Sequence, residues 1–160
     1  MKHVEPRSYL TTLFEGILFK DIAKRYNVRY SKKLYELGRY LVTNQACEFT
    51  YTKPKKILDF RSVHTVENYV NYLSEAFLIF VVDRFSFKIK EQLRSPPKVY
   101  AYDTGMAKSV EFAVTHDAAK SMENVLAIEL LRKGIESYSY KTGPEKRLIL
   151  LSEAAPQSVS

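Results

Sequence analysis

Two short basic stretches contain the side chains best suited to a function, and that function is phosphate binding. One stretch surrounds residues 53–61 and the other residues 88–98, and a segment between them, 63–75, offers Thr and Asn side chains. Lysine and arginine contact DNA phosphates whatever the sequence, whereas asparagine can bond base edges. We therefore expect a DNA-binding surface made of Lys53, Lys55, Lys56, Arg61, Thr65, Asn68, Asn71, Lys88, Lys90, Arg94 and Lys98.

The charge distribution agrees with a polyanionic partner. Residues 1–100 hold 18 Lys and Arg against 10 Asp and Glu, whereas residues 101–160 hold 7 against 8. The formal net charge of +7 therefore comes from the first hundred residues. Such a surplus is typical of nucleic-acid-binding surfaces, although a solvated basic surface would give the same count.

The segment 63–75 favours weak base reading. Its polar face includes Thr65, Asn68 and Asn71 but no Lys or Arg, and it also carries Glu67 and Glu75, which a phosphate would repel. The cations lie before and after it. In this arrangement most contacts are to the phosphates of the DNA backbone and few are to bases, so we expect low sequence specificity.

No catalytic, metal or cofactor site is expected. Cys47 is the only cysteine, and His3, His64 and His116 do not have the spacing of metal ligands. The tripeptide Asp103-Thr-Gly matches the motif in which two aspartates share a proton. A tripeptide recurs often by chance, however, so we interpret Asp103 as tightening the turn after a strand.

Apolar periodicity predicts a leading helix, then three further helices, and then a β-ribbon. Ser8, Ser31, Thr50 or Thr52, and Ser62 are the expected caps of successive helices. The residues Val63, Val66, Tyr69, Val70, Leu73 and Phe77 fall on one face of the last of them. Helices are expected at 8–26, 31–46, 53–58 and from 63 onward, a buried strand at 78–82, an alternating strand at 84–90, a loop at 91–97 and an antiparallel strand at 98–103. Three helices followed by such a ribbon is the order of a winged helix-turn-helix.

The remainder of the chain predicts one more helix and a short hairpin. A helix is expected at 117–133 with Gly134 as its cap, followed by a strand at 137–141 and the start of another near 147. The small polar tail 152–160 is expected to be disordered.

Four stretches together carry a family resemblance. YLTTLFEGILFKDIAKRYNV, TVENYVNYLSEAFLIF, SPPKVYAYDTG and MENVLAIELLRKG, in this order and spacing, resemble the C-terminal half of a family of archaeal and bacterial AAA+ ATPases. The resemblance runs from about residue 8 to residue 141. It implies a winged helix that follows a P-loop ATPase module, and then a domain of unknown function similar to restriction endonucleases.

The departures from that family point away from enzymatic activity. No GxxxxGK[ST] loop is present to hold a nucleotide. Glu123 matches the family's helix glutamate, but the following strand has no Asp and no Glu-x-Lys follows it. One carboxylate cannot fix a divalent metal, so we interpret Glu123 as a helix N-terminal carboxylate favoured by the dipole. A truncated or frameshifted gene would produce this pattern.

These observations predict a mostly α chain with small β content (α+β), in which a winged helix-turn-helix core precedes a truncated α/β nuclease-like segment. The expected parts are a leading helix or linker from a missing ATPase module (1–30), a winged-helix domain (31–105), an incomplete nuclease-like domain (106–151) and a tail (152–160). The expected function is non-enzymatic binding of double-stranded DNA by a cytoplasmic protein with no membrane partner. A protein-docking adaptor, with an AAA+ ATPase module or a second copy as its partner, and a non-functional remnant are the alternatives.

Overall fold

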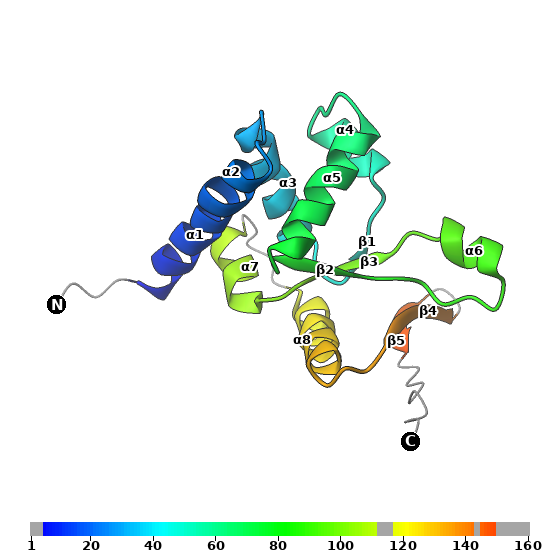
Figure 1. The fold of residues 1–160 in the computed structure, drawn as a ribbon. Helices are drawn as coiled ribbons and strands as arrows, with labels where there is room; N and C mark the ends of the chain where they lie inside the picture. Colours follow the sequence, from blue (N-terminus) through cyan, green and yellow to red (C-terminus); the bar gives the residue numbers. More distant parts are fainter. Residues whose placement is uncertain (1–4, 112–116, 143–144, 150–160) are drawn as a thin grey trace, which may run out of the picture.

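The structure is a computed structural model that describes residues 5–111, 117–142 and 145–149. It is a mostly helical α+β fold with a small three-stranded antiparallel sheet. Figure 1 shows a helical bundle from which a long arm projects, with a further helix and a β-hairpin below it. The helices are α1 (Pro6–Gly16), the π-helical segment η1 (Ile17–Ile22), α2 (Ala23–Arg25), α3 (Ser31–Thr43), α4 (Thr52–Ile57), α5 (Val63–Glu75), α6 (Ile89–Arg94), α7 (Thr104–Val110) and α8 (Ala118–Arg132). The strands are β1 (Cys47–Glu48), β2 (Ile79–Val82), β3 (Lys98–Ala101), β4 (Tyr138–Thr142) and β5 (Glu145–Ile149).

The leading helix is one rod made of α1, η1 and α2. It begins at Pro6 rather than at the expected cap Ser8, because proline fits the first helical position and has no N–H to satisfy there. Its buried stripe is Phe14, Leu18 and Ile22, which are at most 1% exposed. This segment, expected as a leading helix or linker, packs into the main core.

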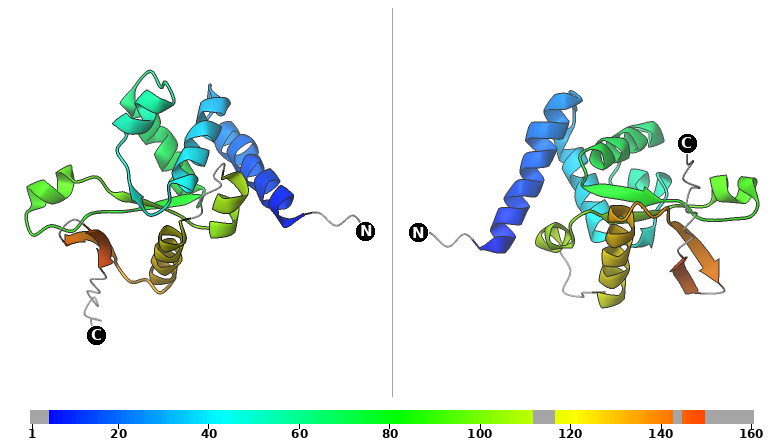
Figure 2. Two further views of the ribbon diagram at one scale, coloured as in Figure 1. Left: turned by 180° about the vertical axis from the view of Figure 1, so that it is seen from behind. Right: turned by 60° about the horizontal axis from the view of Figure 1, so that its bottom comes forward.

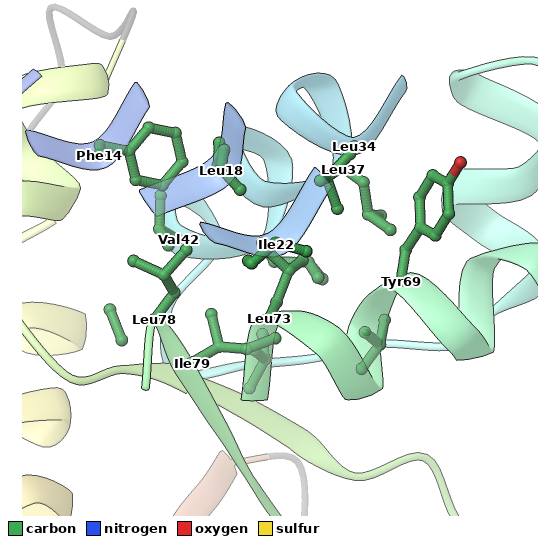
Figure 3. Packing of buried hydrophobic residues seen from close by; sticks show 14 of the residues in the cluster. Phe14, Leu18, Ile22, Leu34, Leu37, Val42, Tyr69, Leu73, Leu78 and Ile79 are labelled. Carbon is green, nitrogen blue, oxygen red and sulfur yellow. The ribbon is translucent and has the colours of Figure 1, made fainter. Parts of the chain in front are cut away.

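The main hydrophobic core lies between the leading rod, α3, α5, α7 and the sheet (Figure 3). Gly38 allows close packing there, since a Cβ on it would lie 3.3 Å from side-chain atoms of both Phe14 and Leu73. The fully buried members include Phe14, Leu18, Leu34, Leu37, Leu41, Val66, Leu73, Ile79 and Val99.

The expected helices are present, but several caps were wrong. Ser31 is the first residue of α3 and makes no cap bond, and α3 ends at Thr43 rather than near residue 46. Neither Thr50 nor Thr52 caps α4, which Tyr51 precedes without a side-chain cap. The predicted cap of α5 is confirmed, because the Ser62 side chain accepts a hydrogen bond from the Thr65 N–H at 3.1 Å.

The apolar face predicted for α5 is confirmed for most of its members and wrong for Phe77. Val66, Tyr69, Val70 and Leu73 are buried. Phe77 lies beyond the helix end with a positive φ of 55°, and its side chain is exposed. The chain turns there into β2, which directs the ring away from the core.

The sheet has the strand order β1-β3-β2, and both pairs are antiparallel. Strands near 78–82 and 98–103 were expected and are confirmed. β1 was not expected, because a two-residue strand is too short to leave a period in the sequence.

The alternating strand expected at 84–90 and the loop expected at 91–97 are wrong. Residues 89–94 form α6 at the end of the arm between β2 and β3, and the pairing partner of β3 is β2 itself. Phe87 and Ile89 are exposed, so their alternation with lysines does not mark a buried sheet face.

The C-terminal part begins with α7, which was not expected and contributes Met106, Ala107 and Val110 to the main core. α8 packs on β3 through a second cluster that includes Tyr100 and Ala127 (Figure 2). α8 and β4 agree with the helix expected at 117–133 and the strand expected at 137–141. Gly134 follows α8 with a positive φ of 66°, as expected of a helix cap. The tail 152–160 lies outside the described residues.

The cap of α5 gives a first testable prediction. Ser62→Ala should lower the free energy of unfolding by about 1 kcal/mol, because it removes the side-chain acceptor of the Thr65 N–H. Urea unfolding would measure the change. Ser31→Ala is the matched control, since Ser31 makes no cap bond, and should change the free energy by less than about 0.5 kcal/mol. Equal effects of the two substitutions would contradict the capping role.

Candidate nucleic-acid interface

The predicted phosphate-binding residues fall into two separate groups. The first, the α4 cations, comprises Lys53, Lys55, Lys56 and Arg61 on α4 and in the turn before α5. The second, the arm cations, comprises Lys88, Lys90 and Arg94 at the arm's end together with Arg84, which the sequence analysis did not single out. Figure 1 shows α6 at the far end of the arm, away from α4. A ligand that touches both groups must therefore be extended.

The α4 cations are accessible. Lys53, Lys56 and Arg61 are exposed, and Lys55 is partly buried. Among the ion pairs of the described chain, none involves these four residues within 4 Å. Their charges are consequently free to meet an external anion.

Arg61 and Thr65 line a surface hollow of about 280 Å³ together with Tyr30, Lys33 and Tyr69. The hollow lies at the N-terminus of α5, where the helix dipole favours negative charge. Lys33 is held internally, because its ammonium donates to the Leu58 carbonyl oxygen and lies 5.8 Å from the centre of the Phe60 ring. Arg61 is the exposed cation of this hollow, which Asp59 also lines.

The polar side of α5 is only partly open to solvent. Asn71 is exposed, while Thr65 and Asn68 are partly buried. His64 lies 3.6 Å from the Glu67 carboxylate, a pair that is ionic only when the imidazole is protonated.

The leading rod contacts the second part of α5 through Tyr26. Tyr26 stacks on Tyr72 with ring centres 3.9 Å apart, and its hydroxyl donates to the Glu75 carboxylate. That hydrogen bond raises the pKa of Tyr26. Glu75, expected to repel phosphate, is exposed but accepts this hydrogen bond from Tyr26, and Glu67 is the other carboxylate on the polar side of α5.

The arm is ordered by contacts at both its base and its tip. At the base, the Phe85 N–H donates to the Ser139 carbonyl oxygen at 2.8 Å and the Ser139 N–H donates to the Asp83 carbonyl oxygen at 2.9 Å. At the tip, the Lys88 ammonium lies 3.1 Å from the Glu91 carboxylate, whose pKa is lowered by the hydrogen bonds from Lys88 and Ser86.

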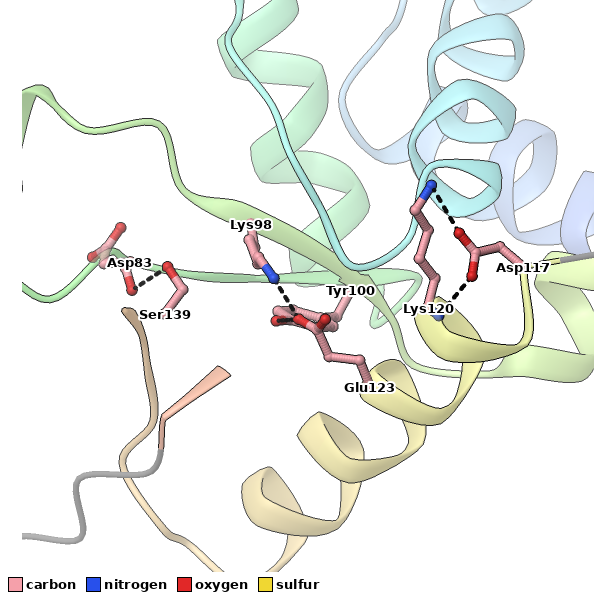
Figure 4. Close-up of polar contacts among 7 residues, drawn as sticks. All are labelled: Asp83, Lys98, Tyr100, Asp117, Lys120, Glu123 and Ser139. Carbon is pink, nitrogen blue, oxygen red and sulfur yellow. Dashed lines mark hydrogen bonds and ion pairs between the residues drawn. The ribbon is translucent and has the colours of Figure 1, made fainter. Parts of the chain in front are cut away.

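Lys98 is not a surface cation, which corrects its expected place on the wing. Its side chain is 4% exposed, and its ammonium lies 2.6 Å from Glu123 Oε1 (Figure 4). The Tyr100 hydroxyl donates to the same oxygen at 2.8 Å. Burial, and then this hydrogen bond, raise the pKa of Tyr100 far above its usual range. Lys98 cannot contact a phosphate without leaving Glu123.

Glu123 is thus an ion-pair partner, not the dipole-stabilised carboxylate that the sequence analysis expected. It is the sixth residue of α8, beyond the first turn. Its neighbour Asn124 accepts a hydrogen bond from the Ala101 N–H and donates one to the Ala101 carbonyl oxygen, both at 2.8 Å. These contacts attach α8 to the central strand.

Asp103 has a structural role. Its carboxylate accepts a hydrogen bond from the Met106 N–H at 2.8 Å and caps α7, so its expected place in a turn after the strand is confirmed. Within the described ranges, no three His, Cys, Asp or Glu side chains cluster as metal ligands would. A cavity of about 510 Å³ beside Cys47 is lined by two ion pairs, Lys98 with Glu123 and Lys120 with Asp117, and also by Glu48 and Lys53.

No helix among the described residues has the length and hydrophobicity needed to cross a membrane.

Comparison with known proteins gives a family without an assigned activity. Residues 2–117 match the model of a domain of unknown function, DUF8612. The chain is 30% identical over 132 residues to the uncharacterized protein MJ1544 of Methanocaldococcus jannaschii, covering 80% of this chain and 29% of that protein. It is 28% identical over 138 residues to an uncharacterized protein of Haemophilus influenzae, covering 84% of this chain and 34% of that protein. The chain thus spans about a third of the length of these relatives, and no solved structure matches it significantly. Since the match covers well over half of its residues, the chain belongs to the DUF8612 family.

Proposed function

We propose that this chain is a non-enzymatic module that binds double-stranded DNA with low sequence specificity. The observation that carries the proposal is the placement of two groups of mostly exposed cations on elements before and after α5, the α4 cations and the arm cations. Cations spread along an extended surface match the regular spacing of phosphates on a duplex.

The order of the elements supports a winged helix. Helices α3, α4 and α5 are followed by the antiparallel pair β2 and β3, and β1 joins β3 from the segment between α3 and α4. In such a module α5 faces the major groove and the arm serves as the wing.

Low specificity follows from the side chains on the open part of α5. Asn68 and Asn71 can bond adenine edges, and Thr65 can contact a base or a phosphate. No Lys or Arg accompanies them on this helix, so the guanine contacts that commonly specify a sequence are missing.

The resemblance to AAA+ ATPases supplies the wider context. The relatives from M. jannaschii and H. influenzae are about three times as long as the matched segment, which leaves room for an ATPase module. In this proposal the chain corresponds to the winged helix and an incomplete nuclease-like part, with an ATPase module or a second copy as a further partner. It performs neither ATP nor phosphodiester hydrolysis, because it has no GxxxxGK[ST] loop and Glu123 is engaged by Lys98.

Fluorescence anisotropy of a labelled random duplex, titrated at low and at physiological salt, tests the proposal. We expect log affinity to fall linearly with log salt concentration, with a slope that counts the phosphates engaged. Absence of binding even at low salt would overturn the proposal.

A double substitution in the arm gives a sharper prediction. Lys88→Ala with Lys90→Ala should weaken binding on the order of tenfold and about equally for unrelated duplexes, because phosphate contacts carry no sequence information. Anisotropy titrations on several duplexes measure this. Lys20→Ala with Lys24→Ala, on the leading rod, removes the same charge from exposed positions and is the control. Unchanged affinity in the arm variant would remove the arm from the interface.

A protein-docking role is the second candidate, and α8 is the observation that favours it. Met122, Val125 and Leu126 are exposed on this helix at helical spacing. Apolar docking would tolerate salt, whereas phosphate binding weakens steeply, so the salt series also separates these two functions.

A further inference from the structure

The tip of the arm exposes three large apolar side chains in a basic setting. Phe87, Ile89 and Leu93 are 88%, 73% and 81% exposed. We call them the tip triad. Ile89 and Leu93 are four residues apart in α6 and lie on one face of it, and Phe87 precedes the helix by two residues. Exposed apolar groups of this size mark an interaction site.

The charges around the tip triad indicate the class of its partner. Residues 84–95 contain four cations, Arg84, Lys88, Lys90 and Arg94, against one carboxylate, Glu91. Glu91 is itself occupied by Lys88 and by the Ser86 hydroxyl. Apolar side chains that alternate with cations fit a partner with apolar faces inside an anionic shell, which is the chemistry of stacked bases between phosphates.

Aromatic packing and backbone hydrogen bonds also support the tip, so that it can be held rigidly against a partner. The Phe87 ring packs edge-on against Phe85 with centres 5.0 Å apart. Phe85 in turn packs against Tyr138 at 6.0 Å and Tyr140 at 6.3 Å on β4. The backbone bonds between Phe85, Asp83 and Ser139 hold the same segment. Figure 4 shows Asp83 and Ser139 in contact. A chain of aromatic contacts therefore connects the tip to the C-terminal hairpin.

We infer that the tip triad is a wedge that enters the minor groove of a bound duplex and partly unstacks one base step, so that the DNA bends. Phe, Leu and Ile are among the side chains that do this in architectural proteins, and they kink the duplex by about 20–90°. The arm cations hold the phosphates on either side of the opened step. Flexible pyrimidine–purine steps are preferred, because they deform at lower cost. This inference rests on the proposed duplex binding.

The test separates bending from binding. A duplex of about 25 base pairs with a central TA step is labelled at its two ends, and energy transfer between the labels reports the end-to-end distance while anisotropy reports affinity. We expect the unmodified chain to shorten that distance. The variant with Phe87, Ile89 and Leu93 all changed to Ser should lose the shortening, keep the salt slope and bind within about tenfold of the unmodified chain.

Two further variants complete the experiment. Changing Met122, Val125 and Leu126 to Ser removes three exposed apolar groups from α8 and should leave bending unchanged. Leu93→Ser alone disturbs the arm least and should reduce the shortening in part. Binding without any shortening, or a tip variant that bends DNA as the unmodified chain does, would overturn the wedge and leave the proposed function intact. Failure of the unmodified chain to bind the duplex would overturn both.

Discussion

Replacing Glu123 with alanine is expected to lower the free energy of unfolding by about 3–5 kcal/mol, the largest stability effect among the substitutions considered. The Lys98 side chain is 4% exposed and has its ammonium 2.6 Å from Glu123 Oε1. Without Glu123 a charged ammonium stays buried with no counter-charge, and the Tyr100 hydroxyl loses its acceptor. Alanine is the better helix former, so propensity does not contribute to the loss.

The cost comes from the orphaned charge and not from the absence of a favourable bond. A double variant, Lys98→Met with Glu123→Leu, should therefore be nearly as stable as the unmodified chain, because apolar groups of similar size often replace a buried pair without loss. Glu123→Gln keeps an oxygen acceptor and should lie between the two.

Glu129→Ala provides the matched control on the same helix. Glu129 pairs with Arg132 at 3.1 Å, but both side chains are at least half exposed. Its substitution should change the free energy of unfolding by less than about 0.5 kcal/mol. Urea unfolding of the four variants would measure the series, and a Glu123→Ala value as small as that for Glu129→Ala would contradict the importance of the buried pair.

The sequence carried enough information for the helices and the α+β class, because these depend on local periodicity. The stripe from Phe14 to Ile22 and the face from Val66 to Leu73 recur at helical spacing, and both are buried. Ser62 was identifiable as a cap since it directly precedes such a face. The expected cap Ser8 failed because the helix already begins at Pro6, and α3 and α4 begin without any side-chain cap.

The sheet and the arm were predicted less well, because they depend on contacts between distant residues. β1 has two residues, and only its pairing with β3 defines it. The alternation of Phe85, Phe87 and Ile89 looked like a strand, but it arises from an aromatic chain at the base of the arm and an exposed tip. No local pattern distinguishes these two origins.

The candidate site was likewise predictable only where it depends on local sequence. The cations of α4 and of the arm tip, apart from the partly buried Lys55, are exposed, as an interface requires, and their clustering in sequence sufficed to name them. Lys98 belonged to the same cluster, yet it faces Glu123, which lies 25 residues away. The presence of a glutamate on α8 opposite a strand lysine is a property of the packing, so composition could not reveal it.

Neutralising the α4 cations should produce the largest effect on DNA binding. Changing Lys53, Lys55, Lys56 and Arg61 to glutamine removes four cations that have no ion-pair partner within the described chain. Each phosphate contact contributes about 0.9 to the slope of log affinity against log salt, so the slope should fall by about 3.6 if all four are engaged. We expect affinity at physiological salt to drop on the order of 10²–10³-fold, equally for unrelated duplexes.

A control of equal charge separates these contacts from a general loss of positive charge. Glutamine at Lys20, Lys24, Lys108 and Lys133 also removes four exposed cations, but these lie on the leading rod, on α7 and after α8. Long-range attraction would weaken similarly in both variants, mainly at low salt, because the Debye length is only about 8 Å at physiological ionic strength. Direct contacts alone predict a changed slope in the α4 variant and a nearly unchanged slope in the control. Equal slopes in the two variants would mean that the chain attracts DNA only through its net charge, and α5 would then hold the core together without facing a groove.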